Sequence, residues 1–280
     1  TASVTYKGDS GESYSNEYTG EVVIPSTVTY EGVEYSVTSI GDYAFYYCSY
    51  LTSITLPESL TSIGKSAFKS CTALTSITLP EGLTSIGNGA FCFCYALTSI
   101  TLPESLTSIG DEAFGYCDAL TSINLPKSLT EIGDDAFYNC YKLYEVYNKS
   151  DLTITAGSED NGYVAYYAKN VYTDSEGESK LKTVGDYLFY ADGEDIELIA
   201  YTGDETSITL PSDYEGKNYG IGERAFYSCD ALTSITIPEG VTEIGFSAFA
   251  YCSALTSITL PEGLTSIGNS AFRSCSALTS

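Results

Sequence analysis

The chain of 280 residues contains no histidine, no methionine and no tryptophan, and only 12 of its residues are lysine or arginine. Without histidine, it lacks the imidazole that most often serves as a general base near neutral pH and as a zinc ligand. It has no apolar run long enough to span a membrane, and it does not begin with a secretory signal. Because no methionine is available as a start, we expect the chain to be a piece of a longer protein.

Basic residues are scarce, whereas acidic residues number 37, so the net charge is −25. Phosphate backbones and anionic lipid surfaces repel such a chain, which excludes nucleic acid as a partner. Neither a Gly-x-Ser-x-Gly nucleophile motif nor a glycine-rich nucleotide loop is present. The common enzyme classes therefore lack their usual sequence signals here.

What the sequence does contain is a repeat, marked by the dipeptide Ile-Gly every 23 residues within two blocks, at Ile40, Ile63, Ile86, Ile109 and Ile132, and at Ile221, Ile244 and Ile267. A fixed period of this length is typical of a solenoid. Within one unit, Ile54 and Leu56 face one side of a predicted strand, while Ser53 and Thr55 face the other. A second extended segment ends at the Ile-Gly. An Ala-Phe-x-x-Cys segment, predicted to form a helical or 3-10 turn, closes the unit.

The unit over residues 74–94, LTSITLPEGLTSIGNGAFCFC, resembles the BspA-like, Treponema pallidum type, leucine-rich repeats of bacterial surface proteins. The resemblance implies a right-handed, curved leucine-rich-repeat solenoid with a parallel β-sheet and little helix. It also implies an extracellular or cell-surface location and a role in adhesion, with contact to host or matrix.

The repeat predicts four segments: an N-terminal cap with a first hairpin-bearing repeat (1–37), regular repeats (38–147), irregular repeats (148–205) and further regular repeats (206–280). We expect the irregular segment to continue the solenoid as one domain, with strands at 144–147, 152–155 and 170–173. Val184-Gly185 is interpreted as its one remaining Ile-Gly marker. Tyr30–Tyr35 (YEGVEY) is echoed by Tyr214–Tyr219 (YEGKNY), which predicts a small hairpin in each half.

Eight of the nine cysteines follow the repeat period. We expect them to be buried thiols rather than disulfides or metal ligands, because free cysteine is among the most buried residue types. Cys92 stands outside the column, and we expect it to be exposed and more reactive. We predict no metal-binding or cofactor-binding residues.

Two sets of acidic residues could carry chemistry. In one set, a glutamate follows the proline at the end of each strand: Glu58, Glu81, Glu104, Glu239 and Glu262. Stacked like charges repel one another, so these side chains either extend into water or are bridged by calcium. The other comprises the pairs Asp111-Glu112 and Asp134-Asp135, which could serve glycoside hydrolysis. Since the matching position of another repeat holds Lys65, these pairs are predicted to be solvated loops, and we expect no catalytic residues.

The outward strand face is the expected binding surface, because solenoids bind ligands there. Its hydroxyls lack the aromatic and arginine anchors of tight interfaces, so we look for anchors among the 26 tyrosines. Tyr163, Tyr166 and Tyr167 are expected to replace the missing Ala-Phe turn. The candidate surface comprises Ser76, Thr78, Ser99, Thr101, Glu145, Tyr147, Tyr163, Tyr166, Tyr167 and Tyr172.

The leading hypothesis is a non-enzymatic, secreted or cell-surface interaction module that binds host protein, matrix or glycan. The alternatives are a structural spacer in a larger surface protein, a glycan-active enzyme, and a hydroxyl lattice that orders water or ice. An uncapped last repeat also predicts end-to-end self-association.

Overall fold

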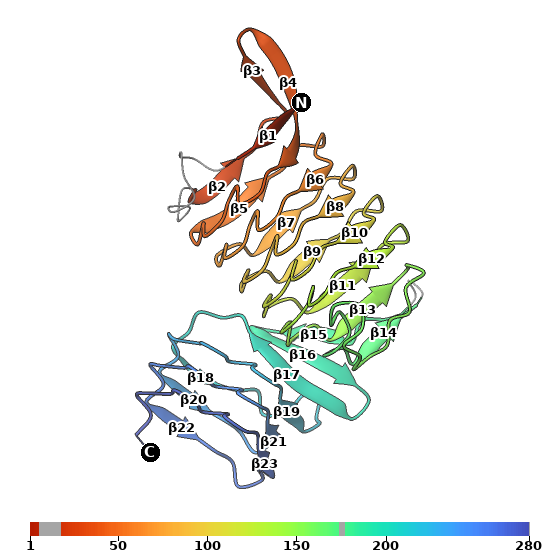
Figure 1. Cartoon of the computed structure of the whole chain (residues 1–280). Helices are drawn as coiled ribbons and strands as arrows, with labels where there is room; N and C mark the ends of the chain where they lie inside the picture. The colour runs from red at the N-terminus through yellow and green to blue at the C-terminus, as the bar shows by residue number, and fades with distance from the viewer. Residues whose placement is uncertain (6–17, 174–176, 280) are drawn as a thin grey trace. The chain divides into compact units, whose positions relative to one another are not determined.

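Figure 1 shows the computed structural model of the chain, which describes residues 1–5, 18–173 and 177–279. These residues form two compact units, unit 1 (Thr1–Gly177) and unit 2 (Glu178–Ser280). Each unit has a hydrophobic core of its own. Part of the predicted N-terminal cap, residues 6–17, lies outside the described residues. Among the residues that are described, no helix is long and apolar enough to cross a membrane.

Each repeat of unit 1 contributes two short strands, one to each of two arrays. The Ile-Gly segments form a parallel sheet of β1 (Ala2–Val4), β4 (Val33–Ile40), β6 (Ser62–Ile63), β8 (Ser85–Ile86), β10 (Ser108–Ile109) and β12 (Glu131–Ile132). The other array pairs β2 (Gly20–Val23) with β5 (Leu51–Thr55), β7 (Ser76–Thr78) with β9 (Ser99–Thr101), and β11 (Ser122–Leu125) with β13 (Glu145–Asn148) and β14 (Asn170–Tyr172). All these pairs are parallel, as predicted for a solenoid.

Unit 2 begins differently, with an antiparallel meander of β15 (Leu181–Val184), β16 (Tyr187–Asp192) and β17 (Asp195–Tyr201). The repeats then resume in parallel, as β19 (Tyr219–Ile221), β21 (Val241–Ile244) and β23 (Ser266–Ile267), and as β18 (Ser207–Thr209), β20 (Ser234–Thr236) and β22 (Ser257–Thr259). Val184-Gly185 is therefore not a repeat marker. Gly185, with φ of 58°, lies in the turn that joins β15 to β16, a conformation that glycine adopts without strain.

The irregular segment contains the predicted strands near 144–147 and 170–173, as β13 and β14. The strand expected at 152–155 is absent, and the prediction was wrong there. The Asn148 side chain explains the difference, because its Nδ2 donates to the Leu152 carbonyl at 2.8 Å and its Oδ1 accepts from the Ser150 N–H at 3.1 Å. These local bonds fold the chain after β13 and compete with the ladder. That residues 148–205 continue one solenoid stays a prediction.

Both predicted hairpins form at the two echoed motifs. β3 (Thr27–Tyr30) pairs antiparallel with the start of β4, and Tyr214 forms an antiparallel bridge with Lys217. The Glu-Gly pair at each tip has positive φ at both residues, 49° and 78° in the first and 50° and 80° in the second. This is the backbone of a tight two-residue hairpin turn.

The Ala-Phe-x-x-Cys segment is not helical, which corrects the prediction of a helical or 3-10 turn. Ser66 and Ser70, two representative positions, have φ of 51° and 64°, in the left-handed region that breaks a right-handed helix. Alternate N–H groups are used differently: Phe68 donates to Ala90 of the next repeat at 2.7 Å, whereas Cys71 donates to Phe68 of its own at 3.1 Å. The backbone N–H groups of the segment are thereby hydrogen-bonded alternately to carbonyls of the same repeat and to carbonyls of the next repeat.

A column of phenylalanine rings runs through the core of unit 1. Successive rings of Phe45, Phe68, Phe91, Phe114 and Phe137 lie 5.0 to 5.3 Å apart, with planes within 19° of parallel. All five are fully buried. The repeats approach one another closely because of the Ile-Gly glycine: a Cβ on Gly87 would lie 2.7 Å from the Gly64 carbonyl carbon. The Ile-Gly marker therefore sets the spacing at which the rings stack.

Candidate interaction surfaces

The strand face of unit 1 exposes two rows of neutral hydroxyls. Ser76 pairs in register with Ser99 and Thr78 with Thr101, and all four are exposed while the isoleucines between them are buried. Elsewhere in the repeat the hydroxyls bond to backbone, as Thr84 does to the Thr61 carbonyl at 3.0 Å. None of the four strand-face hydroxyls has such a bond to a described residue. They are available to a ligand or to water.

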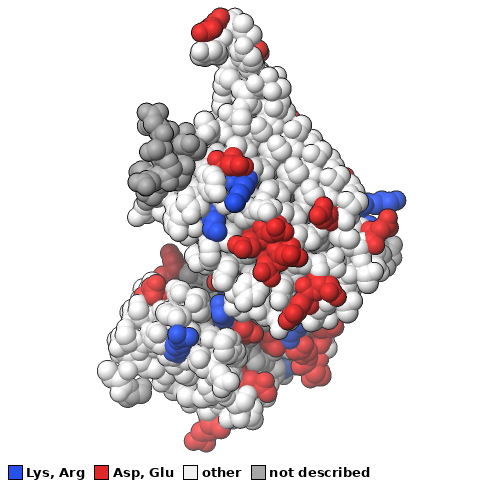
Figure 2. Space-filling model, viewed as in Figure 1, with Lys and Arg blue, Asp and Glu red and all other residues white. Residues whose placement is uncertain are grey.

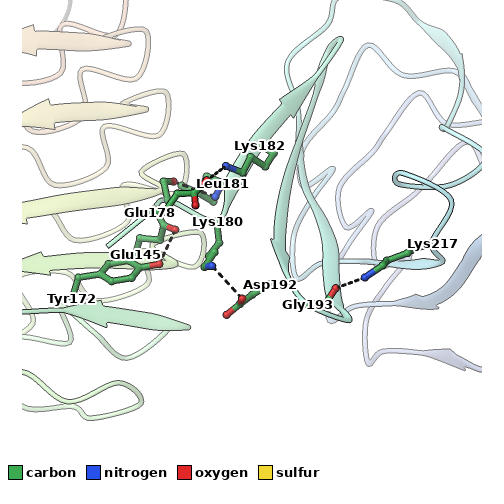
Figure 3. A network of polar contacts seen from close by, with 10 residues as sticks. Glu145, Tyr172, Glu178, Lys180, Leu181, Lys182, Asp192, Gly193 and Lys217 are labelled. Carbon is green, nitrogen blue, oxygen red and sulfur yellow. Dashed lines mark hydrogen bonds and ion pairs between the residues drawn. The ribbon is translucent and has the colours of Figure 1, made fainter. Parts of the chain in front are cut away.

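Two tyrosines lie on the neighbouring three-stranded sheet, whose first strand, β11, contacts β9. Tyr147 on β13 and Tyr172 on β14 are paired in the sheet, and their rings stack with centroids 4.8 Å apart and planes 22° from parallel. The Tyr147 hydroxyl donates to Glu145 Oε2 at 3.0 Å. The Tyr172 hydroxyl donates to Glu145 Oε1 at 3.5 Å, as Figure 3 shows. Glu145 itself is fully buried, contrary to the expectation that it faces solvent. Its carboxylate therefore anchors the tyrosine pair.

A second surface lies on the turn edge, where seven aromatic rings form a continuous chain. Successive centroids are 4.6 to 5.8 Å apart. In order of contact the members of this aromatic row are Phe93, Tyr116, Tyr138, Tyr163, Tyr166, Tyr167 and Tyr141. Tyr138 and Tyr166 are 38% and 39% exposed, and the others are half-buried. Apolar side chains that cluster at a surface are candidates for an interaction site.

The candidate tyrosines thus fall on two different parts of the repeat. Tyr147 and Tyr172 belong to the strand face, whereas Tyr163, Tyr166 and Tyr167 belong to the aromatic row. The last three do not replace the Ala-Phe turn in the core, because the small apolar residues between them, among them Val164 and Ala165, take the buried positions.

Sequence reasoning missed Phe93, Tyr116 and Tyr138, although a signal was present. Phe93 and Tyr116 occupy the second variable position between Phe and Cys of successive Ala-Phe-x-x-Cys segments, one period apart, and Tyr138 occupies the first variable position of the next segment. Residues of the same turn in successive repeats lie along one edge of a solenoid. Lys69, from the preceding repeat, lies over the Phe93 ring with Nζ 5.4 Å from its centroid. A cation at this distance is attracted by the ring and extends the row.

The same edge of unit 2 carries a shorter row. Arg224 lies over the Tyr227 ring with Cζ 4.8 Å from the centroid, and Arg273 over Tyr251 at 5.8 Å. The two rings contact each other edge-on at 5.3 Å. We call these four residues the arginine–tyrosine row.

Unit 2 also contains a groove of about 550 Å³, whose lining includes Lys180, Lys182 and Lys217. Each ammonium already faces an acidic side chain: Lys180 lies 3.3 Å from Asp192, Lys182 3.3 Å from Glu178, and Lys217 2.6 Å from Glu194. Figure 3 shows Lys180 reaching toward Asp192 and Lys217 toward Gly193. Exposed pairs of this kind contribute little stability, but they offset the positive charge of the groove.

The cysteine column is buried, as predicted, except that Cys229 is half-buried. Thiols donate to the phenylalanine carbonyl of the preceding repeat, as Cys71 does to Phe45 at 3.1 Å and Cys94 to Phe68 at 3.2 Å. The expectation that Cys92 is exposed and reactive was wrong, because the residue is fully buried and burial raises its pKa to about 11. The second variable position, held by Phe93, faces outward in its place.

Apart from the buried Glu145, most acidic residues of the described chain lie at the surface. On the face shown in Figure 2 they gather in patches with few basic residues among them. The strand-end glutamates accept backbone N–H groups of the next repeat: Glu239 accepts from Glu262 at 3.3 Å and from Gly263 at 3.2 Å. Both adjacent acid pairs are exposed, as predicted for solvated loops. Among the residues that the structure describes, no three acidic or cysteine side chains are grouped to hold a metal ion.

The sequence model of the BspA type leucine rich repeat region matches the chain in six copies, over residues 38–159 and 198–280, which is more than half of its length. This match confirms the resemblance predicted from the repeats. No curated protein matches the chain.

Several solved structures are similar to the chain. A leucine rich cell surface protein from Faecalibacterium prausnitzii A2-165 is 29% identical, with 92% of this chain and 74% of that chain covered and a TM-score of 0.44. A leucine-rich repeat protein from Bacteroides ovatus ATCC 8483 is 24% identical, with coverages of 97% and 91% and a TM-score of 0.46. The leucine rich repeat protein of T. pallidum is 24% identical, with 95% of this chain and 79% of that chain covered and a TM-score of 0.41.

Proposed function

Because the chain belongs to the BspA type leucine rich repeat family, we propose that it is a non-enzymatic interaction module of a bacterial cell surface. The coarse part of this statement, a repeat fold built for interaction, follows from the family. The finer part, adhesion to a host or matrix protein or a glycan, rests on the surface chemistry of this chain. The description of the F. prausnitzii protein as a cell surface protein supports the location.

The observation that carries the proposal is the aromatic row of unit 1. Tyrosine and phenylalanine combine apolar area with low entropy cost on binding, and contacting rings hold one another in place before a ligand arrives. A preordered surface loses less conformational entropy on binding than a mobile one. A spacer that only separates other domains has no need of seven contacting rings at its surface.

The strand face supplies a second set of contacts in this proposal. Ser76, Thr78, Ser99 and Thr101 offer hydroxyls that make no hydrogen bond to a described residue, and the rings of Tyr147 and Tyr172 stack on the sheet whose first strand, β11, contacts β9. Hydroxyl groups donate and accept hydrogen bonds, so the face suits sugar hydroxyls as well as peptide groups.

The double substitution Tyr138→Ala with Tyr166→Ala tests the aromatic row. On an array of extracellular-matrix proteins and glycans, we expect the unaltered chain to bind at least one probe. Because one truncated anchor residue costs about 2 kcal/mol or more, which is about thirtyfold in affinity, we expect the double variant to lose at least about thirtyfold in affinity for that probe. Both side chains are partly exposed, so the fold is retained.

The matched control is Tyr50→Ala, which removes a tyrosine that is 65% exposed. Its binding is expected to equal that of the unaltered chain. Equal losses in both variants, or no loss in either, would contradict a role for the row. A chain that binds no probe would favour the structural spacer.

End-to-end self-association is proposed from the last repeat. Ile267 is 49% exposed, whereas Ile244, at the same position of the preceding repeat, is fully buried. In the preceding repeat, the equivalent isoleucine, Ile244, pairs in the sheet with the next repeat, which covers it. We expect light scattering to show a mass that rises with concentration, and Ile267→Glu to restore the monomer mass. A strictly monomeric chain at millimolar concentration would overturn this proposal.

A further inference from the structure

The rings at the turn edge differ in whether a cation of the chain lies over them. Phe93 has one, the Lys69 ammonium, and both rings of the arginine–tyrosine row of unit 2 have a guanidinium group. No lysine or arginine of the described residues lies over the rings of Tyr138, Tyr163 and Tyr166. The chain itself thus shows that rings of this edge attract a cation, and its described part leaves these three rings without one.

Acidic residues belong to the same turns as these rings. The Tyr138 N–H donates to the Asp135 carbonyl at 2.9 Å, and the Tyr163 N–H donates to the Glu159 carbonyl at 3.2 Å. Asp135 and Glu159 are both exposed. Partial burial, the charges of Glu159 and Asp135, and a hydrogen bond with the Glu159 side chain raise the pKa of Tyr163. Both carboxylates therefore lie near the Tyr163 hydroxyl.

These carboxylates carry charge that the chain does not neutralise. Neither Asp135 nor Glu159 forms an ion pair with a lysine or arginine that the structure describes. Glu112 occupies the position of Asp135 one period earlier, and it too is exposed and lacks a partner cation among the described residues. The Glu112 N–H donates to the Asp134 carbonyl at 2.9 Å, so the two turns stack directly. Like charges on stacked turns repel one another, and a bound cation relieves that repulsion.

The ligand that matches both features is a polypeptide with several positive charges. The carboxylates repel an anionic polymer, and a neutral glycan gains nothing from them. Arginine and lysine side chains fit both features, because their head groups pair with carboxylates and a guanidinium group also stacks on an aromatic face. The row extends over several repeats, so one small cation would cover only a part of it.

We propose that the aromatic row of unit 1 binds a basic segment of a partner protein, rich in arginine and lysine. Its side chains lie over Tyr138, Tyr163 and Tyr166, and its charges face Asp135 and Glu159. This inference rests on the proposed function and names the class of its partner.

A labelled peptide of ten arginines is the probe for the full chain, and fluorescence anisotropy measures its affinity. Because any acidic protein attracts such a peptide, the test compares two double variants that lose the same charge. Asp135→Asn with Glu159→Gln alters the row, whereas Glu58→Gln with Glu81→Gln alters two exposed strand-end glutamates of the same unit. We expect the first variant to bind about fivefold more weakly than the second, since exposed ion pairs each contribute modestly. Asparagine tolerates the φ of 54° at Asp135, so the turn is retained.

The rings are tested separately from the charges. Tyr138→Phe with Tyr166→Phe keeps both ring faces, and we expect it to bind the peptide as the unaltered chain does. Tyr138→Ala with Tyr166→Ala removes them, and we expect weaker binding. Chitosan, a cationic polysaccharide, is the competing polymer.

The proposal is overturned if the peptide does not bind, if the two acidic double variants bind it equally, or if the phenylalanine variant binds it as weakly as the alanine variant. Tighter binding of chitosan than of the peptide through Asp135 and Glu159 would also overturn it. If Asp135→Asn with Glu159→Gln keeps full affinity for the peptide, while Tyr138→Ala with Tyr166→Ala loses a probe of the matrix and glycan array, the function proposed above stands and only this inference fails.

Discussion

Replacing Phe114 by alanine is expected to lower the free energy of unfolding of unit 1 by about 3–5 kcal/mol, the usual cost of emptying a buried phenylalanine site. Phe114 is fully buried, and its ring stacks on Phe91 at 5.3 Å and on Phe137 at 5.1 Å. The cavity forms in the middle of the column, where repeats on both sides depend on the contact. Such a loss is a large part of the stability of a domain.

Phe93→Ala provides the matched control, because it removes the same side chain from the surface of an adjacent repeat. Phe93 is half-buried in the aromatic row, and we expect a loss of about 1 kcal/mol or less. Urea titrations of the three proteins, followed by circular dichroism, measure both differences. Equal losses from the two variants would mean that the column does not dominate the core of unit 1.

The repeat itself could be predicted from the sequence, because a fixed period translates directly into stacked, in-register columns. The strand face followed from alternation alone: Ser76 and Thr78 are exposed on either side of a buried Ile77. The buried cysteine column followed from the same period. In each case the residues at equivalent positions of successive repeats have the same burial, so burial predicted for one position holds for all of them.

The features that could not be predicted depend on the sign of the backbone angle φ and on side chains from adjacent strands, and not on the repeat period. Tyr116 and Ser70 adopt φ of 61° and 64°, and neither residue type indicates a left-handed backbone as glycine does. The burial of Glu145 depends on two tyrosines, one of them on the next strand, that cover it. The meander of unit 2 did have signals, Gly185 and the Asp-Gly pair at residues 192–193, but the repeat marker was read in place of the turn.

A second large effect is expected from pH: unit 1 loses about 7 kcal/mol of stability between pH 7.5 and pH 9.5. Burial raises the pKa of Cys71, Cys92, Cys94, Cys117 and Cys140 in the folded chain well above that of a free thiol. An unfolded thiol has a pKa of about 8.5. Below that value the thiols are protonated in both states, and the full stability is present.

Above pH 8.5 the unfolded thiols ionise while the folded ones keep their protons, so the free energy of the unfolded state falls relative to that of the folded state and stability falls as pH rises. At pH 9.5 each thiol contributes about 1.4 kcal/mol to this loss, which gives about 7 kcal/mol for the five. The raised pKa values of Tyr46 and Tyr163 act in the same direction, mainly at higher pH.

Urea titrations at the two pH values, in a reducing buffer that prevents disulfide formation, measure the loss directly. Cys117→Ala provides the control, since it lowers stability at both pH values but removes one of the five titrating groups. We expect its pH-dependent loss to be smaller than that of the unaltered chain by about 1.4 kcal/mol. The carbonyl of Phe91, which accepts the Cys117 thiol at 3.4 Å, loses this partner at both pH values alike. A stability that is flat from pH 7.5 to 9.5 would mean that the thiols ionise as readily in the folded chain as in the unfolded one, which their burial opposes.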